Sequence, residues 1–309
     1  MKFSGTFLDE ISVDIVSQNW GRQEWDEDFR TMKSIGIDTV ILIRCGWRKW
    51  LTYPSLILMK REKCYKPPVD LVQLFLELSD KYGMDFYFGL YDSHKYWLDG
   101  QVNEELDLSL HVAEEAWSRY GKYKSFKGWY LPWEISRNSG EMTSVFHRTG
   151  RLCKDLSGGG KVLISPYIAG TKELPRHIEG NITAHQHEKE WNEIMAGIAG
   201  AVDIVAFQDG QIDFPLLPEF LQINKTLAEK HGLTCWTNTE TFDRDLPATR
   251  FLPIRWEKLL LKLNAAAEAG VEKAITFEFS HFLSPHSAFP QAHGLFRRYC
   301  EHFQINPDI

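Results

Sequence analysis

The stretch FKGWYLPWEISR at Phe126–Arg137 indicates how the chain folds. Its apolar part, Gly128–Trp133, has the length and the aromatic content of a buried β-strand. The run ends on Glu134, and an ionised carboxylate is rarely buried without a partner or a task. We therefore expect a buried strand that delivers Glu134 to a functional site.

A second stretch, TCWTNTET at Thr234–Thr241, repeats this arrangement later in the chain and ends near Glu240. In both stretches, a run of apolar and β-branched residues leads to a single glutamate. We expect the two glutamates to face each other across the mouth of one barrel.

Eight apolar runs alternate with segments of helical periodicity along the chain. The expected strands are Phe3–Leu8, Asp38–Arg44, Met84–Tyr91, Gly128–Trp133, Lys161–Ser165, Val202–Gln208, Leu233–Asn238 and Ala274–Phe279. Eight strand–helix units without a break predict an α/β protein with a single (β/α)8 TIM barrel over residues 1–309. The loops after the strands look long and rich in aromatic residues, which is typical of the functional face of a barrel. A doubly wound sheet is the alternative, but the glycine-rich phosphate turn usual there is missing at Asp9–Val13.

The composition narrows the possible partners and compartment. The chain has 309 residues and a formal net charge of −7, which argues against nucleic acid or an anionic membrane as partner. No apolar run approaches the roughly 18 residues of a membrane helix, and the N-terminus turns polar too early for a signal peptide. The five scattered cysteines show no CxxC spacing. We expect a cytoplasmic protein, with a secreted protein that has lost its signal as the alternative, and the oligomeric state stays open.

Acids, amides and aromatic side chains gather at the expected strand ends. Aromatic faces suit the apolar C–H faces of sugars, and carboxylates accept hydrogen bonds from hydroxyls, so we expect a carbohydrate ligand. The candidate substrate contacts are Asp9, Trp20, Arg44, Trp47, Tyr91, Asp92, His94, Trp133, Gln208, Asp209, Trp236, Asn238 and Glu278.

Glycoside hydrolysis needs one protonated carboxyl group and one ionised carboxylate. Glu134 and Glu240 form such a pair, and neighbouring aromatic residues can raise the pKa of the acid by desolvation. Structural alternatives exist for both residues. Glu134 could instead form an ion pair with Arg44 or Arg137, and Glu240 could be an ordinary loop acid.

Several motifs resemble those of a bacterial family of barrels assigned as glycoside hydrolases, over roughly Met1–Phe303. These motifs are SGTFLDE at 4–10, GWYLPWE at 128–134, AFQDG at 206–210 and TNTETF at 237–242. The family in turn resembles the clan of retaining glycoside hydrolases with the acid/base on strand 4 and the nucleophile on strand 7. This resemblance implies Glu134 as acid/base, Glu240 as nucleophile and no cofactor.

One position departs from the clan. The clan usually has asparagine directly before the acid/base, where it holds the sugar 2-hydroxyl, and this chain has Trp133 there. Either Asn238 or Gln208 takes over that role, or the mechanism differs from that of the clan.

Two other classes of function remain open. The first is a carbohydrate-binding barrel without catalysis. The second is a metal-dependent isomerase or deacetylase that uses His185, His187 and Asp209. We expect no metal, because the HxH spacing is a weak signal and Trp191 replaces the second histidine of an HExxH motif.

Overall fold

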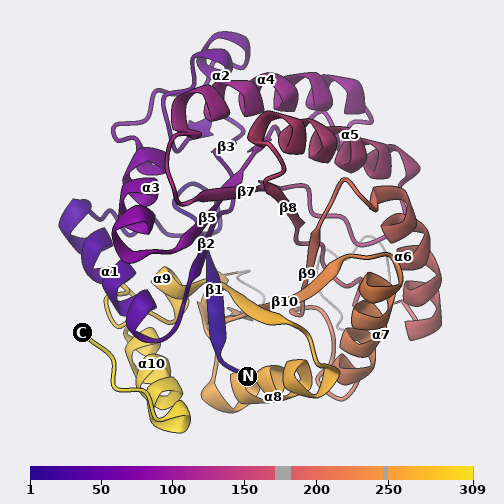
Figure 1. Cartoon of the computed structure of the whole chain (residues 1–309). Coiled ribbons are helices and arrows are strands. Elements are labelled where there is room, and N and C mark those ends of the chain that lie inside the picture. The colour runs from indigo at the N-terminus through magenta and orange to yellow at the C-terminus, as the bar shows by residue number, and fades with distance from the viewer. Residues whose placement is uncertain (171–181, 246–249, 309) are drawn as a thin grey trace.

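The structure, a computed structural model, describes residues 1–170, 182–245 and 250–308. Eight parallel strands follow one another around a closed barrel, and the last pairs with the first (Figure 1). They are β1 (Phe3–Leu8), β2 (Thr39–Leu42), β5 (Asp85–Gly89), β7 (Phe126–Leu131), β8 (Lys161–Ile164), β9 (Ile204–Gln208), β10 (Thr234–Glu240) and β13 (Lys273–Phe277). The predicted (β/α)8 barrel is confirmed, and the doubly wound alternative is wrong because that sheet would not close.

Helices surround the barrel as a ring (Figure 1). In chain order, the long helices are α1 (Arg22–Ser34), α3 (Leu71–Tyr82), α4 (Val102–Tyr120), α5 (Gly140–Ser157), α6 (Ala184–Ile198), α7 (Leu217–Lys230), α8 (Trp256–Ala269) and α10 (Pro290–Phe303). Each buries one apolar face, as Val72, Phe75 and Leu76 do on α3. Helix α1 begins at Arg22, with Gly21 as its N-cap.

The loops after the barrel strands contain short strands and helices that the sequence pattern did not predict. A three-stranded sheet is formed by β3 (Gly46–Trp47), β4 (Trp50–Leu51) and β6 (Tyr91–Asp92). A hairpin of β11 (Phe242–Asp245) and β12 (Arg250–Pro253) follows β10. The short helices are α2 (Leu56–Arg61) and α9 (Phe279–Phe282). These elements build the rim of the barrel, where side chains from distant parts of the chain meet.

The core has two layers, separated by the barrel wall. Strand β7 shows both, because successive side chains of a strand point to opposite faces. Trp129 packs in the outer layer between barrel and helices, whereas Tyr130 packs inside the barrel, its ring centroid 5.0 Å from that of Phe7. The barrel interior is thus filled with side chains, and a cavity opens at its mouth.

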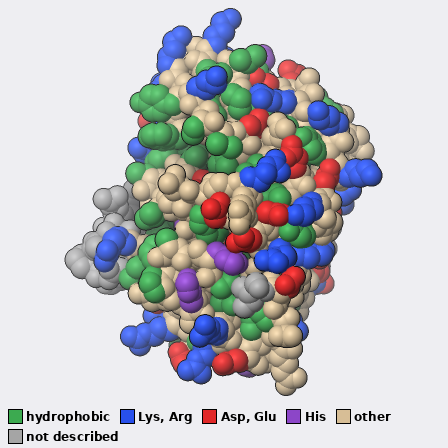
Figure 2. Space-filling view, turned by 90° about the vertical axis from the view of Figure 1, so that its left-hand side faces the viewer, with side chains coloured by type: hydrophobic (Ala, Val, Ile, Leu, Met, Phe, Trp, Pro, Cys, Tyr) green, Lys and Arg blue, Asp and Glu red, His purple; other side chains and the backbone are tan. Residues whose placement is uncertain are grey.

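Charges of both signs are interspersed across the face shown in Figure 2. Between α1 and α3, Lys81 pairs with Asp26 at 2.7 Å, and Arg22 pairs with Glu77. Such exposed pairs contribute little to stability, because water and salt screen the charges. Throughout the described ranges, every helix is too short or too polar to cross a membrane.

Candidate active site at the barrel mouth

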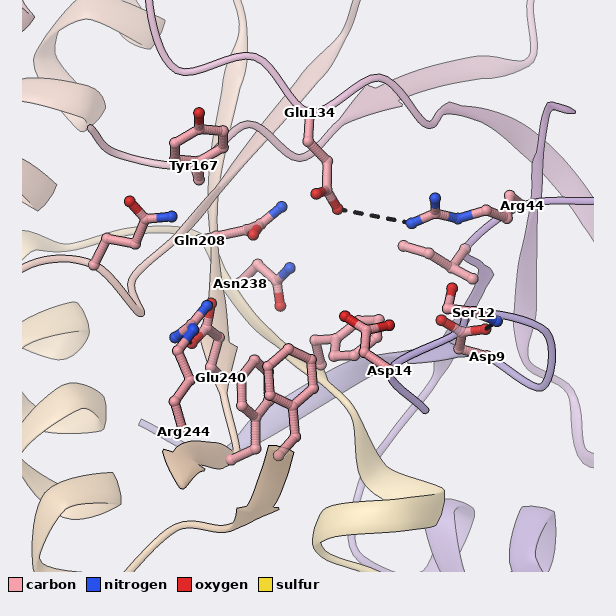
Figure 3. Close-up of a pocket in the computed structure, with 15 residues that line it drawn as sticks. Asp9, Ser12, Asp14, Arg44, Glu134, Tyr167, Gln208, Asn238, Glu240 and Arg244 are labelled. Carbon is pink, nitrogen blue, oxygen red and sulfur yellow. Dashed lines mark hydrogen bonds and ion pairs between the residues drawn. The ribbon is translucent and has the colours of Figure 1, made fainter. Parts of the chain in front are cut away.

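A cavity of about 240 Å³ opens among residues that follow or end the barrel strands (Figure 3). This is the face of a (β/α)8 barrel at which active sites are found. The cavity is lined by Asp9, Ser12, Asp14, Ile43, Arg44, Glu134, Tyr167, Gln208, Gln211, Asn238, Glu240, Phe242, Arg244, Phe251 and Phe277. The two glutamates singled out from the sequence therefore share one cavity.

Glu134 lies shortly after the end of β7 and points into this cavity (Figure 3). Its carboxylate Oε1 is 3.9 Å from Nη2 of Arg44. Solvent reaches 40% of the side chain. Burial among protein groups nevertheless raises the pKa of Glu134 to about 7, against the opposing effect of Arg44. A carboxyl group with this pKa can hold and release a proton near neutral pH.

Glu240 is the last residue of β10, and its surroundings differ from those of Glu134. Its side chain is only 4% exposed. Nη1 of Arg244 donates to Oε2 at 3.0 Å, and Nη2 donates to Oε1 at 3.4 Å. The carboxylate in turn raises the pKa of Arg244 above its usual value. A two-point pair of this kind holds the Glu240 carboxylate in one orientation.

The backbone of Glu240 is held from behind by a buried ion pair. Nζ of Lys262, on α8, donates to Oδ1 of Asp209 at 2.7 Å and to the Glu240 carbonyl at 3.1 Å. The same Oδ1 accepts the Glu240 backbone N–H at 3.1 Å. Asp209 and Lys262 are 1% and 3% exposed in their side chains. Asp209 thus supports Glu240 and does not line the cavity, so its predicted place among substrate contacts is corrected.

Gly210 provides the room for the Glu240 carboxylate. A Cβ atom at this position would lie 1.8 Å from Oε2 of Glu240, far inside any allowed contact. The AFQDG motif therefore supports Glu240 twice, with Asp209 on the backbone and Gly210 beside the carboxylate.

Arg44 follows β2 and is oriented by Asp92, the last residue of β6. The guanidinium Nη1 donates to Oδ2 of Asp92 at 3.0 Å. Oδ1 of Asp92 also accepts from Nε1 of Trp97 and from the backbone N–H of His94. Asp92 is therefore placed behind Arg44, outside the cavity, where it fixes the group that faces Glu134.

Three further polar residues predicted from the sequence line the cavity. Asp9 accepts hydrogen bonds from the backbone N–H groups of Ile11 and Ser12 through Oδ1. Asn238 donates from Nδ2 to Oγ of Ser165 at 3.0 Å. Gln208 donates from Nε2 to the Ser165 carbonyl at 2.8 Å. With Arg44, Glu134 and Glu240, these residues form the part of the predicted site that the structure brings together.

Three predicted contacts point elsewhere. Trp133 is 1% exposed, and its Nε1 donates to Glu105 at 3.0 Å, so it packs outside the barrel wall. Trp236 lies in the packed barrel interior near Tyr87. Glu278 is fully buried, where it caps α9 and binds the ring of His281. Each side chain has an internal partner or packing site, which corrects its expected place at the cavity.

The remaining predicted aromatic contacts lie on the rim or beneath it. Trp20 packs edge-on against Trp25. Trp47 lies on β3 with the His94 ring 5.3 Å away. The hydroxyl of Tyr91 donates to the Arg48 carbonyl at 2.7 Å. None of these rings lines the cavity: Trp47 and Tyr91 belong to the β3–β4–β6 sheet, and Trp20 lies just before α1.

The sequence reasoning missed several residues that line the cavity. Chief among them are Asp14, Ser12 and Arg244, which reach it from the loop after β1 and from the β11 strand. The stretch Phe242–Asp245 has one aromatic residue followed by three charged residues, so it carries no clear strand signal, and its pairing with Arg250–Pro253 in a hairpin was not predicted. The rings of Phe242 and Phe251 stack 4.1 Å apart across that hairpin and add an apolar wall.

A metal centre receives no support from the histidines considered above. His187 is buried on α6, where Nε2 shares a hydrogen bond with Oδ1 of Asn224 at 2.6 Å. Over the ranges that the structure describes, no group of three or more His, Cys, Asp or Glu side chains is arranged to hold a metal ion.

The closed parallel barrel and its carboxylate-lined mouth define the class of this protein, a (β/α)8 barrel like those of glycoside hydrolases. The chain belongs to the family described as "Domain of unknown function (DUF4434)", whose model matches residues 3–289. The resemblance to a bacterial barrel family noted from the sequence is confirmed. No protein with a curated description is detectably similar in sequence.

Solved structures agree on the fold. A Bacteroides thetaiotaomicron protein, provisionally named an alpha-L-fucosidase, is 55% identical with a TM-score of 0.94, over 99% of this chain and 94% of that chain. The GH2 beta-galacturonidase of Eisenbergiella tayi is 10% identical with a TM-score of 0.56, over 90% of this chain and 43% of its own. The family 1 beta-glucosidase of Thermotoga maritima is 12% identical with a TM-score of 0.52, over 86% of this chain and 79% of its own. At these low identities, the last two show the shared fold alone.

Proposed function

We propose that this protein is a glycoside hydrolase with a retaining mechanism, in which Glu134 is the acid/base and Glu240 the nucleophile. One observation carries the proposal. Two carboxyl groups, one just after β7 and one at the end of β10, line one cavity in contrasting environments. Burial raises the pKa of Glu134 to about 7, whereas Glu240 is paired with Arg244 at two points. One proton donor and one ionised carboxylate are what glycoside hydrolysis requires.

The proposed reaction has two displacements. Protonated Glu134 donates its proton to the glycosidic oxygen as Glu240 attacks the anomeric carbon, which releases the leaving group and forms a glycosyl-enzyme. Glu134, now ionised, takes a proton from a water molecule. That water attacks the anomeric carbon, releases the sugar and frees Glu240, so both carboxyl groups return to their starting states.

The substrate class is a carbohydrate, and α-L-fucosides are the first compounds to test. The 55% identical relative carries that provisional name. The cavity also combines polar groups with an apolar wall of Ile43, Phe242, Phe251 and Phe277. A deoxy sugar presents both kinds of surface, because it has hydroxyls on part of its ring and a methyl group elsewhere.

The decisive experiment compares the unmodified protein with Glu240→Gln, Glu134→Gln and the exposed control Glu141→Gln on a panel of 4-nitrophenyl glycosides that begins with the α-L-fucoside. We expect Glu240→Gln to abolish turnover while sugar binding persists, and the control to keep full activity. Proton NMR of the first-formed sugar should show retained anomeric configuration. Full activity of Glu240→Gln would refute its role, and inverted product would exclude the double displacement.

A structure with a bound inhibitor gives an independent check. A separation of about 5–5.5 Å between the two carboxyl groups supports a nucleophile, and about 6.5–9.5 Å supports inversion through a water molecule. Sugar binding without any release of product by the unmodified protein would favour the carbohydrate-binding barrel. Activity lost on chelation and restored by a divalent ion would favour the metal-dependent enzyme.

A further inference from the structure

We infer that the cavity recognises a single neutral sugar ring through two buried acceptor atoms, Oδ2 of Asp9 and Oδ1 of Asn238, which accept hydrogen bonds from two of its hydroxyls. This inference rests on the proposed function. It adds the class of sugar and the protein atoms that bind its hydroxyls.

The Asp9 carboxylate is fixed in orientation but only half satisfied. Oδ1 accepts from the backbone N–H groups of Ile11 at 3.1 Å and Ser12 at 3.0 Å, which locks the group in the turn after β1. Oδ2 is buried, in a residue that is only 2% exposed, and it has no hydrogen-bond partner in the described structure. A buried acceptor left unsatisfied costs about 1–3 kcal/mol, so a ligand that donates to Oδ2 recovers this cost.

The Asn238 amide is oriented by its neighbour. Oγ of Ser165 donates its one proton to the Ala206 carbonyl at 2.8 Å, so toward Asn238 this hydroxyl can only accept. The amide therefore turns Nδ2 to Ser165 at 3.0 Å and leaves Oδ1 without a partner among the described residues. Figure 3 shows Asn238 between Glu134 and Glu240, where a bound sugar would lie.

The charges that line the cavity exclude an acidic sugar. Four carboxyl groups face it, from Asp9, Asp14, Glu134 and Glu240. The cations that line it within the described ranges are Arg44 and Arg244, and both already pair with carboxylates. A uronate or sulfate would meet the carboxylates of Asp9 and Glu240 with no unpaired cation among the described lining residues to receive it, and like charges in a partly desolvated site repel strongly.

The size of the cavity sets the number of sugar units. At about 240 Å³, it is smaller than the roughly 300–1,000 Å³ of pockets that enclose drug-sized ligands. One sugar ring fills it, with its hydroxyls toward Asp9 and Asn238 and its apolar face toward Phe277.

Calorimetric titration with free monosaccharides tests the inference without any hydrolysis. The probes are L-fucose and two matched pairs, D-galactose with D-galacturonic acid and D-glucose with D-glucuronic acid. We expect at least one neutral sugar to bind and every uronic acid to bind at least tenfold more weakly than that sugar. A uronic acid that binds as tightly, or the absence of binding by all neutral sugars, would overturn the inference.

Two variants test the atoms. Asp9→Asn keeps Oδ1 for the turn but replaces the acceptor Oδ2 with a donor, and we expect at least tenfold weaker binding of the preferred sugar. Asn238→Leu, of similar volume, removes the second acceptor and should weaken binding to a similar extent. The control Asp85→Asn lies exposed at the start of β5, at the opposite end of the barrel, and should bind normally. Unchanged affinity in Asp9→Asn with an unchanged melting temperature would refute the assignment.

The outcomes separate the two proposals. A protein that binds neutral sugars without hydrolysing any glycoside keeps this inference and loses the proposed function. A protein that hydrolyses uronides keeps the proposed function and loses the inference.

Discussion

The guanidinium of Arg244 contacts both carboxylate oxygens of Glu240, at 3.0 and 3.4 Å, from the strand that follows β10. The two residues are four positions apart along the chain, and the turn after β10 brings Arg244 back over the carboxylate (Figure 3). The pair places a fixed positive charge beside the proposed nucleophile, and it is among the contacts at the mouth that the sequence did not predict.

Arg244→Gln should lower kcat by about 10–100-fold, because a hydrogen bond to a charged group contributes about 1.5–3 kcal/mol. Arg244→Lys should recover part of this loss, since lysine supplies the charge but not the two-point geometry. Steady-state kinetics on an aryl glycoside checks both variants. Equal kcat in Arg244→Gln and the unmodified protein would show that the pair does not support catalysis.

Gly210→Ala should impair catalysis without unfolding the protein. Its Cβ would lie 1.8 Å from Oε2 of Glu240, so the carboxylate must move away from Arg244. Overpacking of this kind costs about 1–3 kcal/mol of stability. The matched control is Gly294→Ala on α10, where an added Cβ meets no atom within 4 Å. We expect at least a tenfold loss of kcat in Gly210→Ala and none in the control, each read beside its melting temperature.

The pKa of Glu134 predicts how activity depends on pH. Burial raises this pKa to about 7, so the carboxyl group is protonated below that pH and can act as the acid. As pH rises through about 7, the proton is lost and kcat/KM should fall on natural glycosides. In Glu134→Gln, this alkaline limb should vanish, with residual activity confined to aryl substrates whose leaving groups need no proton. An alkaline limb that persists in the variant would assign the titration to another group.

The buried pair of Lys262 and Asp209 predicts a large loss of stability on disruption. Burial already raises the pKa of Asp209, and the Lys262 ammonium opposes that rise. Lys262→Met removes the compensation and should lower the free energy of unfolding by about 3–5 kcal/mol. The double variant with Asp209→Asn should regain part of it, because no unpaired charge then remains. Urea unfolding curves of the unmodified protein, Lys262→Met and the double variant provide the comparison. An equal loss of stability in the single and double variants would contradict this account.

Asp28 predicts a pH dependence of stability that is independent of catalysis. It is fully buried on α1, accepts from the hydroxyls of Ser280 and Ser284, and burial raises its pKa from 3.8 to about 7. The folded protein therefore binds this proton more tightly than the unfolded chain does. The stability that this confers is present at low pH and lost as pH rises from about 4 to about 7, at no more than about 1.4 kcal/mol per pH unit.

Asp28→Asn removes that titration. Relative to the unmodified protein, the variant should gain stability as pH rises from 5 to about 7 and then show a constant difference up to pH 8, measured by urea unfolding at each pH. A difference between the two proteins that stays constant over this range would show that Asp28 does not titrate there.

Much of the fold could be predicted because strands and helices leave local patterns of apolar residues and glycines in the sequence. Strand β1 lies at its expected residues, Phe3–Leu8, and the other barrel strands overlap the predicted runs. Strands buried on both faces read as continuous apolar segments, and glycines such as Gly83 end helices in a left-handed conformation. The short β3, β4 and β6 strands escaped prediction, since two-residue pairings carry almost no periodic signal.

The site was harder to predict, because the depth of a side chain in the barrel is not a local property. Trp236, Asn238 and Glu240 share one face of β10 by the two-residue period. Trp236 pairs with Lys273 at the start of β13 and packs in the interior, whereas Asn238 and Glu240 reach the mouth. The two-residue period of a strand predicts which face of the sheet a side chain occupies. Only the register of neighbouring strands decides which residue on that face reaches the cavity.

The sequence by itself determined the barrel and the two strand-end glutamates, because alternation and apolar runs encode which segments become buried strands. Only the tertiary structure decided that Arg244 and Gly210 meet Glu240, that Asp209 lies behind it, and that Trp133 turns away to Glu105. These contacts join segments far apart in the chain or beyond a turn. Their geometry depends on how the closed barrel aligns its strands, and residue types in a linear pattern do not record that alignment.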